Sequence, residues 1–299
     1  MALRITPTQS DRQFLRYHTE AQDTENQLIE RLSSLKRVNR PSDDPTASAQ
    51  IIQTHKQLSE NKAYQSAIQQ LMGNFSVVEN GLNQMYELMV SAQEKAVQGA
   101  SETYSATARV ALADEIDQIR EEMLAQLNVQ YQGRYVFSGT ATDTQPFDAT
   151  GTYFGDTNQK FVEINTSQTV PEKFFGSDIA FGTGGMGSPE DMLDMLSDLS
   201  IALRADNTVA IDAELQRFDP ILNRLNTAIG TLGARTATLL REEDRYTNFD
   251  VTLQEILSEI EDADLAEEIT NLELNKVTLE SQLRAQNQIS RLNLFNFLG

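Results

Sequence analysis

The sequence contains no cysteine and no tryptophan, and it has only two histidines. The absence of cysteine excludes disulfide bonds, thiolate metal sites and cysteine nucleophiles. His18 and His55 lie in separate segments of helical pattern, so we expect no histidine metal site. Aromatic residues make up only 7% of the 299 residues, which favours long thin helices over one thick globular core.

Positive charge is also scarce, because 24 lysines and arginines stand against 44 acids and give a net charge of −20. Such a surface repels nucleic-acid phosphates and anionic membranes, so neither is expected as a partner. No apolar run approaches the roughly 18 residues of a membrane span. Residues 1–10 lack the apolar segment and cleavage site of a signal peptide, so secretion would need a route without one.

Patterns typical of catalysis or cofactor binding are weak. Carboxylate clusters such as residues 242–244 lie on polar helix faces, with no apolar pocket indicated around them. The glycine-rich residues 182–187 precede a helix, as a phosphate loop does, but Glu190 and Asp191 would repel phosphate and no Walker lysine follows. We therefore predict no catalytic residue, no metal and no cofactor, and the chain is not expected to be an enzyme.

Helical patterns dominate both ends of the chain. The first predicted helix has apolar residues at heptad spacing and runs up to Pro41, since the residue before a proline avoids the α region. Residues 45–98 and 103–130 give two more helices. Another is expected to start with Ser188 as its N-cap and to run to about residue 264, with a break near Pro220. A final heptad helix starts at Leu265.

The middle of the chain has a different composition. Nine of the 15 glycines lie between residues 133 and 187, together with short β-prone pieces at 134–137, 151–154 and 160–165. The predicted fold is mainly α with an inserted β-rich domain, in a long antiparallel helical bundle whose terminal heptad helices pair as a coiled coil. The predicted domains are 1–44 with 265–299 (terminal coiled coil), 45–133 with 188–264 (helical bundle) and 134–187 (β-rich).

The two terminal helices are expected to carry self-assembly. Burial along one narrow line of side chains does not offset the entropy of ordering two long helices, so other faces should pack against neighbouring copies. We expect the ends to fold on assembly. The predicted polymerisation seam comprises Phe14, Tyr17, Ala21, Leu28, Leu35, Val38, Leu265, Ile269, Leu272, Leu279, Leu283, Ile289 and Leu292.

Opposite charges concentrate near the inner ends of the terminal helices. Lys36, Arg37 and Arg40 form a basic cluster, whereas residues 250–264 contain six acids and no base. In an antiparallel pair these regions lie at similar height. They are expected to attract each other within the chain or between copies; the alternative is two separately solvated charge runs.

Residues 32–45, LSSLKRVNRPSDDP, resemble a signature of the bacterial flagellin family. Residues 131–140, YQGRYVFSGT, are similar to the start of the outer domain in the hook–filament junction members of that family, which flagellins proper usually lack. Residues 233–235 and 289–298 add to the resemblance. Leu35 departs from it, because flagellins typically carry glycine there. The connector residues that match are Lys36, Arg37, Asn39, Arg40, Pro41, Asp43, Asp44 and Pro45.

The resemblance implies a structural protein of the extracellular bacterial flagellum. Its junction members form a ring of identical subunits that joins hook-associated protein 1 to the flagellin filament, and they leave the cell unfolded through the flagellar type III pathway. A flagellar export chaperone holds the C-terminal helix of such proteins, and here an apolar tail could serve it: Leu294, Phe295, Phe297 and Leu298.

Three alternative functions stay open at this point. A flagellin would polymerise without limit when seeded with itself, which a junction protein would not. A hydrolase with a pocket in the β domain would show a buried acid pair. A coiled-coil scaffold unrelated to flagella is the third alternative.

Overall fold

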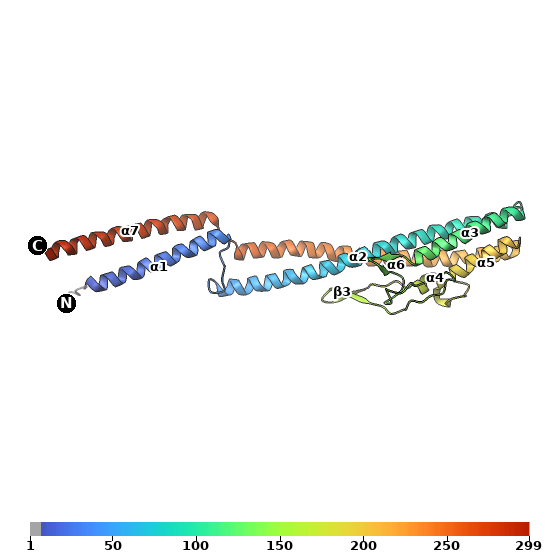
Figure 1. The fold of residues 1–299 in the computed structure, drawn as a ribbon, viewed down its shortest axis with the longest axis horizontal. Coiled ribbons are helices and arrows are strands. Elements are labelled where there is room, and N and C mark those ends of the chain that lie inside the picture. Colours follow the sequence, from blue (N-terminus) through green and yellow to red (C-terminus); the bar gives the residue numbers. More distant parts are fainter. Residues whose placement is uncertain (1–6, 299) are drawn as a thin grey trace. The chain divides into compact units, whose positions relative to one another are not determined.

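A computed structural model describes the backbone of residues 7–298 and the side chains of residues 9 and 11–288. Contacts divide the chain into two compact units, Met1–Glu60 with Asn248–Gly299 (unit 1) and Asn61–Thr247 (unit 2). The helices in Figure 1 are α1 (Pro7–Ser34), α2 (Pro45–Ala100), α3 (Ala106–Leu127), α4 (Gly176–Phe181), α5 (Met192–Arg204), α6 (Thr208–Glu261) and α7 (Leu265–Leu298), with a 3₁₀ turn at Gly182–Gly184. The strands are β1 (Gln130–Tyr131), β2 (Arg134–Tyr135), β3 (Phe161–Asn165) and β4 (Gln168–Pro171).

The core of unit 2 is built on heptad spacing in its two longest helices. Buried apolar residues of α2 alternate in steps of three and four, which keeps them on one side of the helix. In α6 every seventh residue from Ile211 to Tyr246 is buried. The α2 residues are Ile68, Leu71, Phe75, Val78, Leu82, Met85, Met89, Ala92 and Ala96; those of α6 are Ile211, Phe218, Leu225, Leu232, Leu239 and Tyr246.

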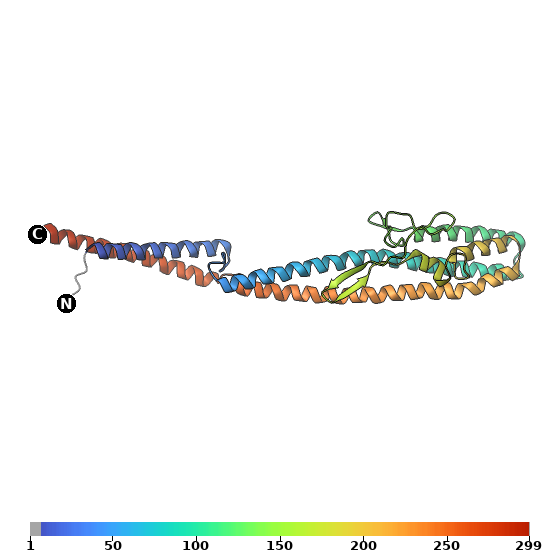
Figure 2. The same ribbon diagram turned by 90° about the horizontal axis from the view of Figure 1, so that it is seen from below.

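Helix α3 packs against α5 within unit 2, and Figure 2 shows the two helices, green and yellow, side by side. Buried apolar residues of α3, such as Ile116 and Met123, enter the same core as Leu196 and Leu199 of α5. On the exposed side, Arg204 of α5 forms ion pairs with acids of α3, at 2.6 Å from Asp114 and from Asp117. The packing of these two helices therefore combines a buried apolar face with a charged edge.

The predicted break near Pro220 is wrong, because α6 is continuous from Thr208 to Glu261. A proline inside a helix costs roughly 3 kcal/mol, but the completely buried Phe218 and Ile221 hold this segment in the core. The real interruption lies between α5 and α6, where Asp206 adopts φ +55°.

The predicted N-cap at Ser188 is also wrong, since α5 begins at Met192 with Asp191 as its cap. The Asp191 carboxylate accepts hydrogen bonds from the N–H groups of Leu193 (2.9 Å) and Asp194 (3.1 Å). An aspartate accepts hydrogen bonds from these N–H groups as well as a serine does, and its negative charge also interacts favourably with the positive end of the helix dipole.

Segment 130–181 contains two antiparallel sheets, each of two strands, β1–β2 and β3–β4. The strand expected at 151–154 is reduced to a single bridge between Phe147 and Tyr153. Phe137, Phe147 and Ile164 are fully buried in the common core of unit 2.

The predicted fold class is confirmed: a mainly helical chain with an inserted β-containing segment and paired terminal helices. Among the residues described, no helix has the length and apolar composition that crossing a membrane requires.

Candidate functional site: the terminal helices and their connector

Helices α1 and α7 lie side by side and antiparallel within unit 1 (Figure 1). The Asn275 side-chain N–H donates to the carbonyl oxygen of Ala21 at 2.9 Å, and Arg31 forms an ion pair with Glu268 at 3.3 Å. These two contacts join positions far apart in the sequence and fix which residues of one helix face which residues of the other.

The contact line between the two helices is mainly apolar on α1 and mainly polar on α7. On α7 the least exposed residues follow heptad spacing, but only Leu272 and Leu279 among them are apolar. Glu268 is only 7% exposed, and one of its carboxylate oxygens has no partner among the described residues. Polar residues at such positions specify register and reduce the stability of a helix pair. The α7 residues are Glu268, Leu272, Asn275, Leu279, Gln282 and Gln286; those of α1 are Phe14, His18, Ala21, Glu25, Leu28 and Leu32.

The predicted seam residues whose side chains are described therefore divide into two groups. Ala21, Leu28 and Val38 are buried within unit 1, and Phe14, Leu272 and Leu279 are half-buried. Five others are exposed by between 43% and 57%: Tyr17, Leu35, Leu265, Ile269 and Leu283. Ile289, Leu292 and the tail residues Leu294, Phe295, Phe297 and Leu298 lie outside the residues whose side chains the structure describes.

Leu265, Ile269 and Leu283 form an exposed apolar strip on α7, which we call the outer strip. Steps of four and fourteen residues return to nearly the same side of a helix. Further exposed apolar residues that the sequence reasoning missed lie elsewhere on the two helices: Leu15, Ile29, Leu274 and Val277. Contiguous exposed apolar surface is uncommon on monomeric proteins, which makes the outer strip a candidate surface for contact with another protein.

Helix α1 ends at Ser34, several residues before the predicted end at Pro41. Leu35 adopts φ +60°, and its carbonyl oxygen accepts a hydrogen bond from the N–H of Ala263 at 3.1 Å. Lys36 then forms an antiparallel bridge with Asp262. Leu35 and Val38 therefore belong to a bridged connector and not to the helical seam in which the heptad pattern placed them.

Two aspartates of the connector organise its turn. The Asp43 carboxylate accepts the N–H groups of Arg40 (2.8 Å) and Asn39 (3.1 Å), and the N–H of Arg40 lowers the pKa of Asp43. Asp44 caps α2 as predicted: it accepts the N–H groups of Ala47 (2.9 Å) and Thr46 (3.1 Å), and the first of these bonds lowers the pKa of Asp44. Pro45 then takes the first helical position, where its missing N–H costs nothing.

The predicted attraction between the basic cluster and residues 250–264 is present within unit 1, but one lysine carries it. Lys36 lies 2.5 Å from Glu261, whose side chain is 11% exposed. Arg37 donates to the carbonyl oxygen of Ile260 at 2.9 Å and lies 3.6 Å from Asp44. The acid that pairs with Arg40, at 2.9 Å, is Glu30 of α1.

Replacing Leu35 by glycine is expected to stabilise the connector. A left-handed conformation costs a non-glycine residue about 1–2 kcal/mol, which exceeds the extra entropy that glycine loses on folding. Leu35→Val should have the opposite effect, because β-branched residues tolerate positive φ least. Hydrogen exchange at the N–H of Ala263 measures both: it should slow several-fold in L35G and accelerate in L35V. Faster exchange in L35G would contradict the conclusion that the positive φ of Leu35 strains the connector.

In the glycine-rich loop before α5, two backbone amides are already bonded to carboxylates of the chain. The Glu190 carboxylate accepts the N–H of Thr183 at 3.0 Å, and Asp191 accepts the N–H of Gly187 at 2.8 Å. Two acids of the chain itself therefore hold the groups that a phosphate would need, and this loop gives no support to nucleotide binding.

Comparison with known proteins matches both ends of this chain to one family. The profile of the bacterial flagellin N-terminal helical region matches residues 7–142, and that of the bacterial flagellin C-terminal helical region matches residues 215–298. Flagellar hook-associated protein 3 of Salmonella typhimurium is 26% identical over 288 residues, covering 90% of this chain and 91% of that protein. Its counterpart from Escherichia coli is 27% identical over 287 residues, covering 89% and 90%.

Solved structures with the same fold include flagellar proteins of other bacteria. A putative flagellar hook-associated protein from Vibrio parahaemolyticus has a TM-score of 0.67 and 22% identity, covering 74% of this chain and all of that one. The flagellar junction protein FlgL from Legionella pneumophila has a TM-score of 0.58 and 17% identity, with coverages of 70% and 100%. At these identities the likeness establishes a shared fold.

Proposed function

Because this chain belongs to the bacterial flagellin family, we propose that it is a structural subunit of the junction between the flagellar hook and filament, and not an enzyme. The observation that carries the proposal is similarity to two hook-associated proteins 3 over about nine-tenths of the chain, the inserted segment included. Copies of the chain would form a ring that binds hook-associated protein 1 on one side and seeds flagellin on the other.

The terminal helices are the part of the molecule that we propose carries assembly. Their mutual contact line is polar on α7, while the outer strip of Leu265, Ile269 and Leu283 remains exposed. In a ring these leucines and isoleucine would be buried against neighbouring subunits, which supplies the apolar contact needed to overcome repulsion between chains of charge −20. In this arrangement the terminal helices line the inner tube and residues 134–187 face outwards.

Location and export follow from the same proposal. The protein would act outside the cell, after passing unfolded through the flagellar type III pathway, and a chain without cysteine has no disulfide to hinder that passage. The apolar tail from Leu294 to Leu298 would be held by an export chaperone before secretion.

Deleting the gene in its host is the direct test. Electron microscopy should show hooks without filaments, and flagellin should accumulate as monomer in the medium, because no junction ring is present on which the filament can assemble. A plasmid copy should restore filaments. Hooks without filaments and no flagellin in the medium would favour a flagellin role, whereas normal filaments would reject both flagellar functions.

A further inference from the structure

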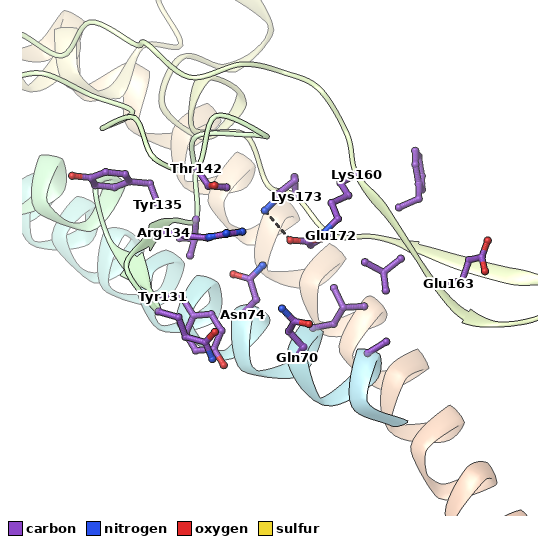
Figure 3. A pocket seen from close by; sticks show the side chains of 16 residues that line it. Gln70, Asn74, Tyr131, Arg134, Tyr135, Thr142, Lys160, Glu163, Glu172 and Lys173 are labelled. Atoms are coloured by element: carbon purple, nitrogen blue, oxygen red, sulfur yellow. Dashed lines mark ion pairs between the residues drawn. The ribbon is translucent and has the colours of Figure 1, made fainter. Parts of the chain in front are cut away.

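A cavity of about 810 Å³ lies in unit 2 between α2, the β1–β2 hairpin and the segment that carries β3 and β4 (Figure 3). Its volume falls in the range of small-molecule sites, roughly 300–1,000 Å³. Most such sites are predominantly apolar, but charged groups, carboxamides and tyrosines form much of this lining. A polar ligand therefore suits it better than an apolar one.

The cavity is cationic although the whole chain is strongly acidic. Three bases (Arg134, Lys160 and Lys173) and two acids (Glu163 and Glu172) line it, which gives a local net charge of +1 against −20 for the chain. A positive hollow on a negative molecule attracts small anions from a surface that otherwise repels them.

Glu172 is fully engaged by the wall of the cavity. One of its carboxylate oxygens lies 2.8 Å from the Lys173 ammonium, and the other lies 2.8 Å from that of Lys160. Burial acts to raise the pKa of Glu172, but the hydrogen bonds from Lys160 and Lys173 outweigh burial and hold the pKa below its usual range. This carboxylate thus stays ionised, each of its oxygens has a lysine partner, and no ion pair joins it to Arg134 in the part of the chain described.

Arg134 has no such partner. Its side chain makes no ion pair or hydrogen bond with the described residues, and Figure 3 shows it extending across the cavity toward Lys173 and Glu172. The carboxamides of Asn74 and Gln70 lie below it on α2, also without hydrogen bonds to the part of the chain that is described. A guanidinium and two carboxamides therefore face the same space without a partner among the described residues, and a ligand there would displace only water from the exposed Arg134 and Gln70.

The wall opposite Arg134 is held firmly in place. Lys173 is 7% exposed; its N–H donates to the Gln159 side chain at 2.8 Å, and its carbonyl oxygen accepts from the same side chain at 3.1 Å. Arg235 of α6 donates to the carbonyl oxygen of Pro171 at 3.1 Å. These bonds anchor the backbone of the wall, and the ion pair with Glu172 holds the Lys173 ammonium; a wall fixed in this way is pre-organised, which reduces the entropy cost of binding.

We propose that this cavity binds a carboxylate-bearing sugar of the uronic acid class. The Arg134 guanidinium would hold the carboxylate through two parallel N–H···O bonds, the strongest geometry available to it. The Asn74 and Gln70 carboxamides, which both donate and accept, suit the adjacent hydroxyl groups. The inference stands apart from the junction function, since none of these residues belongs to the terminal helices or their connector.

Titration of the full 299-residue chain with galacturonate, followed by ligand-observed NMR, tests the proposal. Galacturonate should bind at least tenfold more tightly than galactose, which lacks the carboxylate, or acetate, which lacks the hydroxyls. Arg134→Gln should weaken galacturonate binding at least tenfold with an unchanged circular dichroism spectrum. Arg241→Gln, which changes an exposed arginine of α6 outside the cavity, should bind as the wild type does.

Two further arms separate the sources of the ligand. Binding of trigalacturonate more tightly than the monomer would identify a polysaccharide, and equal binding a free sugar acid. Acetate binding as well as galacturonate, an unaffected Arg134→Gln variant, or no binding at all would overturn the proposal. Loss of concentration-dependent self-association in Arg134→Gln, without any sugar binding, would overturn it too and assign the cavity to an acidic segment of a second copy.

Discussion

Replacing Ile269 and Leu283 together by glutamate is expected to abolish filament attachment and leave the monomer folded. The two side chains are 49% and 48% exposed within the monomer, so about half of each already lies in water and the folded monomer loses only part of an apolar contact at each position. In the proposed ring the exposed half of each side chain would be buried against a neighbour, which is worth about 1 kcal/mol per side chain, roughly half the value for burying a whole one. A glutamate there removes that contact and adds a buried charge, whose unpaired burial costs several kcal/mol more. The loss recurs in every copy of the ring.

Motility and electron microscopy measure this effect. Cells that carry the double variant should swim no better than the deletion strain and show hooks without filaments. The variant should still be secreted into the medium, and its circular dichroism spectrum should match that of the wild type. Absence of the variant from the medium would instead place the defect in export.

A matched control keeps the charge and changes the place. Asn271→Glu with Thr278→Glu adds the same two charges to exposed positions of α7 that lie off the outer strip. This variant is expected to form filaments normally, because its new carboxylates stay in water. Equal failure of both variants would mean that added negative charge alone blocks assembly, and normal filaments in the Ile269/Leu283 variant would remove the outer strip from the proposal.

Ile269 and Leu283 were predicted to lie in the seam between the two terminal helices, but the residues of α7 that contact α1 are different ones. This difference shows how far the sequence alone could predict the pairing of the terminal helices. The heptad spacing correctly predicted two helices that pair. The choice of face on α7 followed the most apolar residues, including Ile269 and Leu283, whereas the pairing is set by polar contacts such as Asn275 with Ala21. A sequence that must satisfy an intramolecular pair and another protein shows both patterns at once, and periodicity alone does not separate them.

The ends of helices were predicted where a local rule decides them and missed where distant contacts do. Asp44 and Pro45 start α2 as expected, since capping depends on residues three positions away at most. The end of α1 at Ser34 depends on the hydrogen bond between Leu35 and Ala263, a residue far away in the sequence. Pro220 was misjudged for the same reason, because core packing around Phe218 and Ile221 outweighs the local preference.

The cavity in unit 2 was beyond sequence reasoning for a related reason. Its walls come from three segments, residues 67–74, 131–142 and 160–173, and no local pattern places them together. One indirect signal was present: Gly73 leaves room for Tyr131, since a Cβ there would collide with the tyrosine hydroxyl. A glycine inside a long helix marks such a close approach without naming the partner.

Replacing Phe137 by alanine is expected to destabilise unit 2 by about 3–5 kcal/mol, the usual cost of removing a buried phenylalanine ring. Phe137 is fully buried, and its ring packs beside Gly81 of α2, 3.5 Å from where a Cβ at that glycine would lie. Its carbonyl oxygen accepts the N–H of Gly176 at 2.8 Å and the hydroxyl of Tyr153 at 3.1 Å. The residue therefore joins the inserted segment to the helical core, which gives a packing reason for its place in the 131–140 resemblance.

Urea unfolding followed by circular dichroism measures the loss, with Phe161→Ala as the matched control. Phe161 is 61% exposed in β3, so its truncation should cost less than about 1 kcal/mol. Phe137→Ala should lower the unfolding midpoint by about 1 M or more, given slopes near 3 kcal/mol per M for a unit of this size. If the two variants lost equal stability, Phe137 would not anchor the insertion. Limited proteolysis locates the effect: cleavage between residues 134 and 187 should accelerate in Phe137→Ala well before cleavage in α2 or α6, because those helices keep the rest of their heptad core.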